Sequence, residues 1–259
     1  MSEFIKINNK ITIKPNGADY ELIPSKVYDL MYDNFEGMSY LKENGNLNMP
    51  KKLYKFEEDD NLIKRCLTYF NSEESTLTTG VLLSGMKGSG KSMLAKRLAI
   101  ESNLPIIVVD RTYPLRKIES FFKGINTSVC IILDEFEKNS LCWPTENILT
   151  FLDGIQYTAK KLVIMTCNDT KEINDNLFDR SSRIRYWREY KKDDNIKFID
   201  TLIEDKGIED SSKIKEFILK NMKVISIDNI NAFLDEYVMF KDIFTIEQIF
   251  DMMNLTKKE

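Results

Sequence analysis

One segment of the sequence has residue types and spacing that suit phosphate chemistry: three glycines, two lysines and two serines within eight positions. It reads Gly85-Met86-Lys87-Gly88-Ser89-Gly90-Lys91-Ser92. The glycines let backbone N–H groups turn toward phosphate oxygens, Lys91 reaches the outer phosphates, and the Ser92 hydroxyl is placed to ligate Mg²⁺. An apolar run precedes the segment and an apolar-periodic helix follows it, so the helix dipole also favours an anion. These features predict a phosphate-binding loop, and the alternative is a Gly/Ser-rich turn that matches by chance.

Two adjacent carboxylates follow a second apolar run. Val129–Leu133 has the composition of a buried parallel strand, and Asp134 and Glu135 come directly after it. In phosphoryl transfer such a pair divides the work: the first acid orients Mg²⁺ and the second polarises the attacking water. The 43 residues from Lys91 to Asp134 leave room for the intervening elements. Two acids after a strand are a weak signal alone and a strong one beside a complete phosphate-binding loop.

Three further polar residues are candidates for the same chemistry. The predicted strand Leu162–Thr166 leads to Asn168, whose side-chain amide is suited to hold the attacking water from the far side. Arg180 and Arg183 lie three residues apart. A guanidinium stabilises charge on a transferring phosphoryl group, and supplied in trans it makes hydrolysis depend on a neighbouring subunit. The alternative for the arginines is a solvated basic turn or a salt-bridge pair.

The N-terminal section, to about residue 48, has short-range signals only. Phe4–Ile7 and Ile11–Ile13 alternate as short strands do, and Asn16-Gly17 is a turn signal. Ser25 is a candidate helix cap, and the apolar residues after it fit one helical face: Val27, Leu30 and Met31. We predict a small β-hairpin plus a helix, serving either as a packing appendage or as a docking element.

An amphipathic helix is predicted before the first core strand. Its apolar positions share one face: Leu62, Ile63, Cys66, Leu67 and Phe70. Upstream of it, Tyr54 and Phe56 are candidates to line an adenine pocket. Ordinary core packing is the favoured interpretation for each.

Composition limits the classes of function. The chain has 259 residues, 42% of them hydrophobic, which is enough for a proper core. A net charge of −4 does not favour wholesale capture of nucleic acid, although a local basic face stays open. With no histidine, chemistry must use carboxylates, lysine, arginine and a metal ion. The four cysteines lack a C-x-x-C pair and are predicted to be reduced core residues. We find no candidate membrane span or signal peptide and expect a soluble, intracellular protein.

In order and spacing, several segments resemble the AAA ATPases, and in particular the conventional AAA branch. They are Gly85–Ser92, Ile131–Glu135, Leu149–Gly154, Thr166–Asn168 and Arg180–Arg183. More narrowly, the chain resembles the compact AAA proteins of bacterial viruses and the Bcs-type mitochondrial AAA proteins. The resemblance covers roughly residues 50 to 250.

The resemblance implies a role for each matched position. Gly85–Ser92 corresponds to Walker A, Asp134 to Walker B, Glu135 to the catalytic glutamate and Asn168 to sensor 1. Arg180 and Arg183 are the implied arginine fingers, with the choice between them open. ATP and Mg²⁺ are the implied substrate and metal, with Ser92 and Asp134 on the metal.

The implied fold is α/β: a P-loop αβα sandwich with a five-stranded parallel sheet, assembled as a ring that is usually a hexamer. We divide the chain into a small N-terminal β/α appendage over 1–48, the ATPase core over 49–189, and a C-terminal helical lid over 190–259. Apolar periodicity supports the lid, with helices around 196–203, 214–218 and 227–237. A capping box at Thr245-Ile246-Glu247-Gln248 begins the last one.

Three departures from the family pattern are visible. Ser181-Ser182 replaces the usual Pro-Gly between the two arginines, and Ser226–Asn229 stands where many members have a small Gly-Ala pair near the nucleotide. No aromatic–aliphatic–Gly triplet that grips an unfolded chain follows the second strand. Tyr113, beside Pro114, is the one aromatic candidate there, and Phe121 and Phe122 are better interpreted as helix packing.

Three classes of function follow from these residues. The leading hypothesis is a remodelling ATPase that acts on an unidentified protein or protein–nucleic-acid assembly. This hypothesis includes a viral protein that acts in the cytoplasm of its host. The second is a DNA-directed helicase loader or clamp-loader-like motor, which a basic pore lining would favour. The third is a nucleotide-gated scaffold without turnover, against which the complete polar set, Glu135 included, argues.

Overall fold

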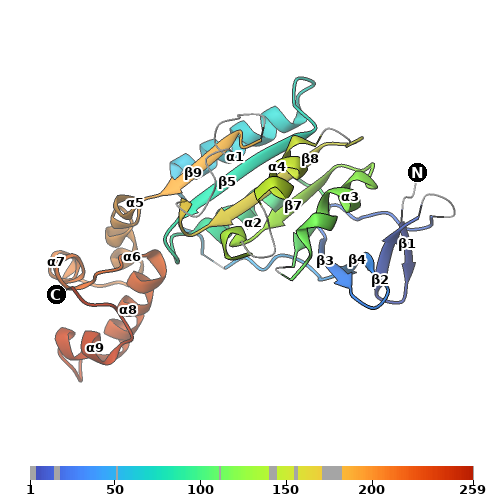
Figure 1. Ribbon diagram of the computed structural model, residues 1–259. Coiled ribbons are helices and arrows are strands. Elements are labelled where there is room, and N and C mark those ends of the chain that lie inside the picture. Colours follow the sequence, from blue (N-terminus) through green and yellow to red (C-terminus); the bar gives the residue numbers. More distant parts are fainter. Residues whose placement is uncertain are drawn as a thin grey trace. The chain divides into compact units, whose positions relative to one another are not determined.

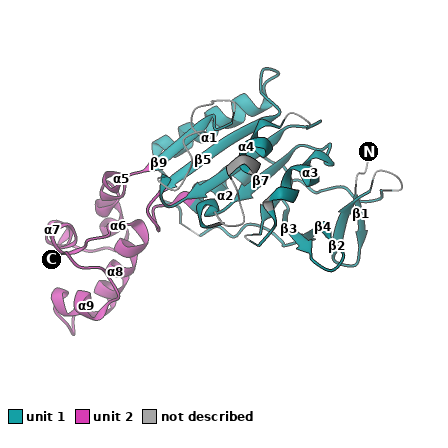
Figure 2. Ribbon diagram, viewed as in Figure 1, with its two compact units in different colours: residues 1–84, 92–189 teal, residues 85–91, 190–259 magenta. Residues whose placement is uncertain are grey.

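The computed structural model describes residues 4–14, 18–50, 52–110, 112–139, 145–154, 157–170 and 183–258. By its internal contacts the chain divides into two compact units (Figure 2). The first comprises residues 1–84 and 92–189, and the second residues 85–91 and 190–259. The short segment 85–91, which contains most of the predicted phosphate-binding loop, therefore groups with the C-terminal residues although it lies between two elements of the first unit.

Within the described residues, nine strands form one sheet in the order β1-β2-β4-β3-β6-β7-β8-β5-β9. The strands are β1 (Phe4–Ile7), β2 (Lys10–Ile13), β3 (Val27–Asp33), β4 (Met38–Glu43), β5 (Thr78–Gly85), β6 (Ile106–Val109), β7 (Val129–Leu133), β8 (Lys161–Cys167) and β9 (Tyr186–Tyr190). Pairing is parallel from β3 through β6, β7 and β8 to β5, and antiparallel among β1, β2, β4 and β3. The predicted α/β class is confirmed.

Helices cover both faces of the sheet because its central strands are apolar on both sides. The helices of this unit are α1 (Glu57–Asn71), α2 (Lys91–Glu101), α3 (Ile118–Lys123) and α4 (Thr145–Asp153). Phe122 of α3 and Phe151 of α4 pack 5.6 Å apart, between ring centroids, in the same core as Ile131 of β7. Figure 1 shows α3 and α4 beside β7. The residue preceding Ile131, Cys130, faces the opposite side, where Ser102 and Cys66 lie. Alternation along β7 thus supplies two cores from one strand.

The prediction of an N-terminal helix after Ser25 is wrong, because Val27–Asp33 forms strand β3. Ser25 has φ +61° and is followed by extended backbone, so it caps no helix. Val27, Leu30 and Met31 fit one helical face, but the buried positions Tyr28 and Leu30 also fit a strand. Pairing with β6 on one side and β4 on the other decides for the strand. The N-terminal section consequently extends the central sheet, while β1 and β2 confirm the two predicted short strands.

The candidate gripping residue and the predicted core aromatics are buried. Phe121 and Phe122 are core residues of α3, as predicted. Tyr113 is 1% exposed, and its hydroxyl lies 2.7 Å from Ser39 Oγ. Burial raises the Tyr113 pKa to about 12. Its side chain therefore has a packing role in this unit. Phe56 is likewise buried, which agrees with core packing.

The cysteines that the structure describes are all buried and form no disulfide: Cys66, Cys130 and Cys167. Burial raises the pKa of the Cys66 thiol to about 12. The prediction of reduced core cysteines is confirmed for these three. Cys142 lies outside the described residues.

The second unit contains the helices α5 (Lys192–Ile196), α6 (Ile199–Asp205), α7 (Ser211–Asn221), α8 (Ile227–Phe240) and α9 (Ile246–Met252). The predicted first helix is divided into α5 and α6, and the other predicted helices are confirmed. Phe217 of α7 stacks on Phe233 of α8 at 5.8 Å, and Phe250 of α9 packs edge-on against both rings. The capping box is present: Thr245 Oγ1 accepts from the Gln248 N–H, and Gln248 Oε1 accepts from the Thr245 N–H.

Candidate functional site

The predicted phosphate-binding loop connects β5 to α2. Its three glycines, Gly85, Gly88 and Gly90, have φ values of +133°, +73° and +105°. Residues with a Cβ rarely adopt these angles, so glycine is needed to turn the backbone this way. Lys91 is only 6% exposed, and its Nζ donates to the carbonyls of Gly85 and Met86 at 2.6 and 2.8 Å. These two carbonyls therefore hold the Lys91 ammonium group inside the turn of the loop.

The start of the loop packs closely against the end of β9. A Cβ added at Gly85 would lie 2.5 Å from the Tyr190 carbonyl oxygen, so no larger residue fits there. Ser89 is fully buried, and its Oγ has no hydrogen-bond partner among the described residues. The loop thus includes a buried polar atom that protein groups in the described ranges leave unsatisfied.

Ser92, Asp134 and Thr166 converge at the carboxyl ends of β7 and β8. The Ser92 hydroxyl donates to Asp134 Oδ1 at 3.5 Å, and the Thr166 hydroxyl donates to the same oxygen at 2.6 Å. Thr166 also accepts from the Glu135 backbone N–H at 2.8 Å. The two predicted metal ligands are therefore brought together. Sequence reasoning missed Thr166, which fixes both acidic residues; its position, just before Asn168 on a neighbouring strand, was the available signal.

Glu135 and Asn168 are in contact. Asn168 Nδ2 donates to Glu135 Oε1 at 3.0 Å, and Lys138 Nζ lies 2.5 Å from Glu135 Oε2. Glu135 has φ +48°, a left-handed conformation that is uncommon for a residue with a side chain. Such backbone strain is concentrated at functional sites. The carboxylate is thus oriented by both an amide and an ammonium group.

A third carboxylate, missed by sequence reasoning, lies beside this pair. Glu137 is 7% exposed, and its Oε1 accepts from both the backbone N–H and the Nδ2 of Asn168, each at 2.8 Å. Its Oε2 has no hydrogen-bond partner among the described residues. Glu137 therefore determines the orientation of the Asn168 amide. It lies in a short 3₁₀ turn, Phe136–Asn139, after the predicted acidic pair, where sequence spacing gives no cue.

Arg183 is buried and forms an ion pair with a partly exposed carboxylate of the same chain. Its Nε and Nη2 donate to the two carboxylate oxygens of Asp153, at the end of α4, at 2.7 and 2.9 Å. The residue is 8% exposed. This geometry favours the salt-bridge alternative for Arg183, because a guanidinium held by two oxygens is not presented to a neighbour. Arg180 lies outside the described residues.

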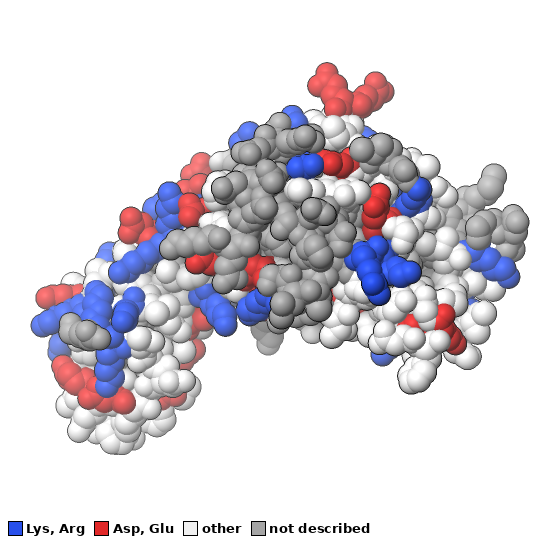
Figure 3. Space-filling model, in the orientation of Figure 1, with Lys and Arg blue, Asp and Glu red and all other residues white. Residues whose placement is uncertain are grey.

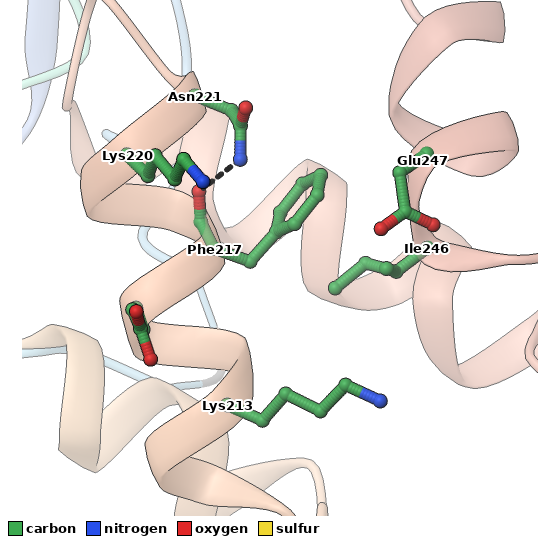
Figure 4. A pocket seen from close by; sticks show the side chains of 7 residues that line it. Lys213, Phe217, Lys220, Asn221, Ile246 and Glu247 are labelled. Atoms are coloured by element: carbon green, nitrogen blue, oxygen red, sulfur yellow. Dashed lines mark hydrogen bonds between the residues drawn. The ribbon is translucent and has the colours of Figure 1, made fainter.

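A separate hollow in the second unit has different chemistry. It lies between α7 and α9 with a volume of about 330 Å³, and its lining includes Lys213, Lys220 and Glu247 around Phe217 (Figure 4). These side chains form no nucleophile–base or metal-ligand arrangement. On the face shown in Figure 3, Lys and Arg are interspersed with Asp and Glu. In the described ranges, no helix has the length and apolarity needed to cross a bilayer.

A comparison with known protein families gives a match to the segment that contains this site. Residues 81–189 match the family model described as "ATPase family associated with various cellular activities (AAA)". The match begins in β5 and ends in β9, and it includes the phosphate-binding loop and the Asp134–Asn168 cluster. Among curated proteins, no sequence matches the chain.

Proposed function

We propose, from the premise that this chain contains an AAA ATPase domain, that it binds ATP and hydrolyses it with Mg²⁺. The observation that supports hydrolysis best is the contact between Glu135 and Asn168. A carboxylate and an amide oriented toward each other suit the positioning and deprotonation of an attacking water. Glu137 and Thr166 hold the two residues in that arrangement. We propose Glu135 as the general base and Asn168 as the group that orients the water.

The donor set fits a magnesium ion that is held mainly by the nucleotide. Ser92 Oγ and Asp134 Oδ1 approach to 3.5 Å, and no group of three or more acidic, histidine or cysteine side chains suited to a metal occurs among the described residues. Mg²⁺ usually takes one or two protein ligands and completes its shell with waters and phosphates. Ser92 and Asp134 would hold it. When bound, the ion supplies charge neutralisation for the phosphoryl group.

The loop residues Gly85–Ser92 are the proposed phosphate ligands. Backbone N–H groups of the loop would bind the phosphate oxygens, and the Lys91 ammonium group would exchange its carbonyl partners for the outer phosphates. The unpartnered Ser89 hydroxyl is consistent with a polar environment around the loop.

We propose that the active form is a homo-oligomeric ring, with six subunits favoured, and that Arg180 acts on the neighbour's nucleotide. Arg183 then has a positioning role, because its ion pair with Asp153 ties the chain after Arg180 to α4. The proposed domains remain 1–48, 49–189 and 190–259. The free, buried cysteines and an ATP substrate favour an intracellular location.

The proposed biological role is the remodelling of a protein or protein–nucleic-acid assembly. Burial of Tyr113 supports local rearrangement rather than threading of an extended chain, because the candidate gripping side chain is in the core. A helicase-loader-like motor is the second candidate. It predicts ATPase stimulation by single-stranded DNA, whereas the leading role predicts stimulation by a protein partner. A scaffold without turnover predicts neither.

The substitution Glu135→Gln tests the proposed function. We expect the variant to bind a fluorescent ATP analogue with an affinity within about threefold of the parent and to lose turnover by about 10²-fold or more, because water activation is removed while the phosphate contacts remain. Asp200→Asn, an exposed acid of α6, is the control and should keep full turnover. Equal turnover in Glu135→Gln and the parent would remove Glu135 as the base.

A further inference from the structure

One carboxylate of the second unit lies against the phosphate-binding loop. A Cβ added at Gly88 would lie 2.9 Å from Asp228 Oδ2 and 3.0 Å from Ser226 Oγ. Gly88, Ser226 and Asp228 belong to the same compact unit, in which residues 85–91 group with residues 190–259 (Figure 2). The loop and the beginning of α8 are therefore in direct contact, and the contacting group on α8 is an acid.

The start of α8 is held in this position by its own hydrogen bonds. Ser226 caps the helix, since its Oγ accepts from the Asn229 N–H at 3.2 Å. The residue before it is fixed by α5: fully buried Asn195 donates through Nδ2 to the Ile225 carbonyl at 3.1 Å. Asn229 Nδ2 donates in turn to the Val224 carbonyl. These hydrogen bonds hold the beginning of α8 in the position from which the Asp228 carboxylate approaches Gly88.

The Asp228 carboxylate lies near the proposed phosphate-binding loop, and no group among the described residues donates a hydrogen bond to it. Its side chain remains accessible to solvent, and partial desolvation by the surrounding protein raises its pKa. The environment of Asp228 therefore disfavours its negative charge, and a phosphate anion nearby would disfavour it further.

We propose that Asp228 is a negative determinant of nucleotide affinity: its carboxylate opposes the phosphate anion at Gly88, so that tight binding requires the start of α8 to move away from the loop. This inference rests on the proposed nucleotide-binding function and deepens it. It gives the loop–α8 contact a defined consequence, since each nucleotide state would favour a different distance between the helix start and the loop. The repulsion lowers nucleotide affinity, and the same repulsion couples the charge of the bound phosphate to the position of α8.

The inference makes a quantitative distinction between ligands. Like-charge repulsion scales with the number of phosphate charges, and it weakens with salt because Asp228 is solvent-accessible. A carboxylate that instead accepts hydrogen bonds from ribose hydroxyls would improve binding of every nucleotide equally. Neutralisation of Asp228 therefore has opposite signs under the two roles.

The test compares Asp228→Asn with the parent and with Glu236→Gln. Glu236 lies eight residues further along α8, about 12 Å at the helical rise, so it is a matched acid remote from the loop. Dissociation constants for ADP and for a non-hydrolysable ATP analogue are measured by displacement of a fluorescent nucleotide, at about 50 mM and 500 mM salt. We expect Asp228→Asn to bind the ATP analogue about fivefold tighter at low salt, with a smaller gain for ADP and little gain at high salt. Glu236→Gln should match the parent.

The outcomes separate the inference from the function on which it rests. If the parent binds ADP, and Asp228→Asn binds ADP and the ATP analogue no more tightly than the parent does, the inference is overturned while the nucleotide site stands. If the parent binds neither nucleotide, the proposed function fails and the inference with it. Asp228→Ser, a second neutral variant, is measured in parallel, and thermal unfolding without nucleotide confirms that each variant is folded. A gain in both neutral variants supports the charge as the cause.

Discussion

At the residue scale, the site depends on side chains that hold other side chains. Thr166 contacts both acidic residues of the predicted pair, and Glu137 contacts the amide that faces Glu135. Because the proposed base and the proposed water-orienting amide must reach the same water molecule, such positioning residues should affect turnover more than nucleotide affinity.

The first prediction concerns Thr166. Thr166→Val keeps the volume and β-branching but removes the hydroxyl that bridges Asp134 Oδ1 and the Glu135 N–H. We expect turnover to fall about tenfold or more with nucleotide affinity nearly unchanged, and Thr166→Ser to restore most of the loss because it returns the hydroxyl. Steady-state kinetics and nucleotide titration measure the two effects. Equal loss in the valine and serine variants would point to packing rather than to the hydrogen bonds.

The second prediction concerns the ion pair of Arg183 with Asp153. Asp153→Ala leaves the Arg183 guanidinium charged in a buried site and should lower the free energy of unfolding by about 3 kcal/mol, whereas Arg183→Ala leaves the partly exposed Asp153 carboxylate and should cost less. The double variant should lose less than the sum. Chemical denaturation gives these values. If Arg183 acted only on a neighbouring subunit, Arg183→Ala would instead lose turnover with unchanged stability. That result would contradict the positioning role.

At the element scale, the N-terminal strands are held to the sheet by a cluster of charges. Glu43 of β4 accepts from Lys6 of β1, from Tyr20 and from Lys26, at 2.6, 2.6 and 3.0 Å. These groups come from four separate segments of the N-terminal section. The bond from Lys6, with those from Tyr20 and Lys26, lowers the pKa of Glu43 to about 2.

The third prediction is a pH dependence of this cluster. The folded pKa of Glu43 is depressed, so its stabilising contribution is present above the ordinary glutamate pKa of about 4.5 and is lost as the pH falls toward about 2. Urea midpoints of the parent and Glu43→Gln should therefore differ most at neutral pH and converge over that window. Glu36→Gln is the control, because Glu36 pairs with Lys10 at an exposed position. A difference that stays constant with pH would contradict the assignment.

At the scale of the whole molecule, assembly into a ring is part of the proposed function. Residues 81–189 match the AAA family model, and ring formation is the proposal that gives Arg180 a function. The internal salt bridge of Arg183 leaves Arg180 as the candidate for action across a subunit boundary. Activity should then depend on assembly, which mass action makes measurable.

The fourth prediction follows from this dependence. ATPase activity per subunit should rise with protein concentration and reach a plateau, in parallel with the oligomer fraction seen by sedimentation. Arg180→Ala should assemble and bind nucleotide as the parent does, but lose about 10²-fold or more in turnover. Addition of Arg180→Ala subunits to an inactive Glu135→Gln preparation should recover part of the activity, because a mixed interface has one intact base and one intact arginine. Full activity in a monomer would contradict the ring.

The sequence by itself determined the features that depend on neighbours along the chain. The loop over Gly85–Ser92 was predictable because its chemistry requires glycines, lysine and serine at fixed spacing, and the central strands because parallel strands buried on both faces are continuous apolar runs. The helix boundary at Thr245 followed from a capping box, which is closed by residues three apart. In each of these cases the interaction that fixes the structure is local.

Tertiary structure decided what depends on residues far apart. Val27–Asp33 fits a helix or a strand by periodicity, and only pairing with β6 and β4 selects the strand. Glu137 meets Asn168 across 31 residues, Arg183 meets Asp153 across 30, and Asp228 meets Gly88 from the far end of the chain. No spacing rule connects such pairs, because the distance between them is set by how the strands and helices pack. Their chemical roles therefore become visible only once the fold has brought the side chains together.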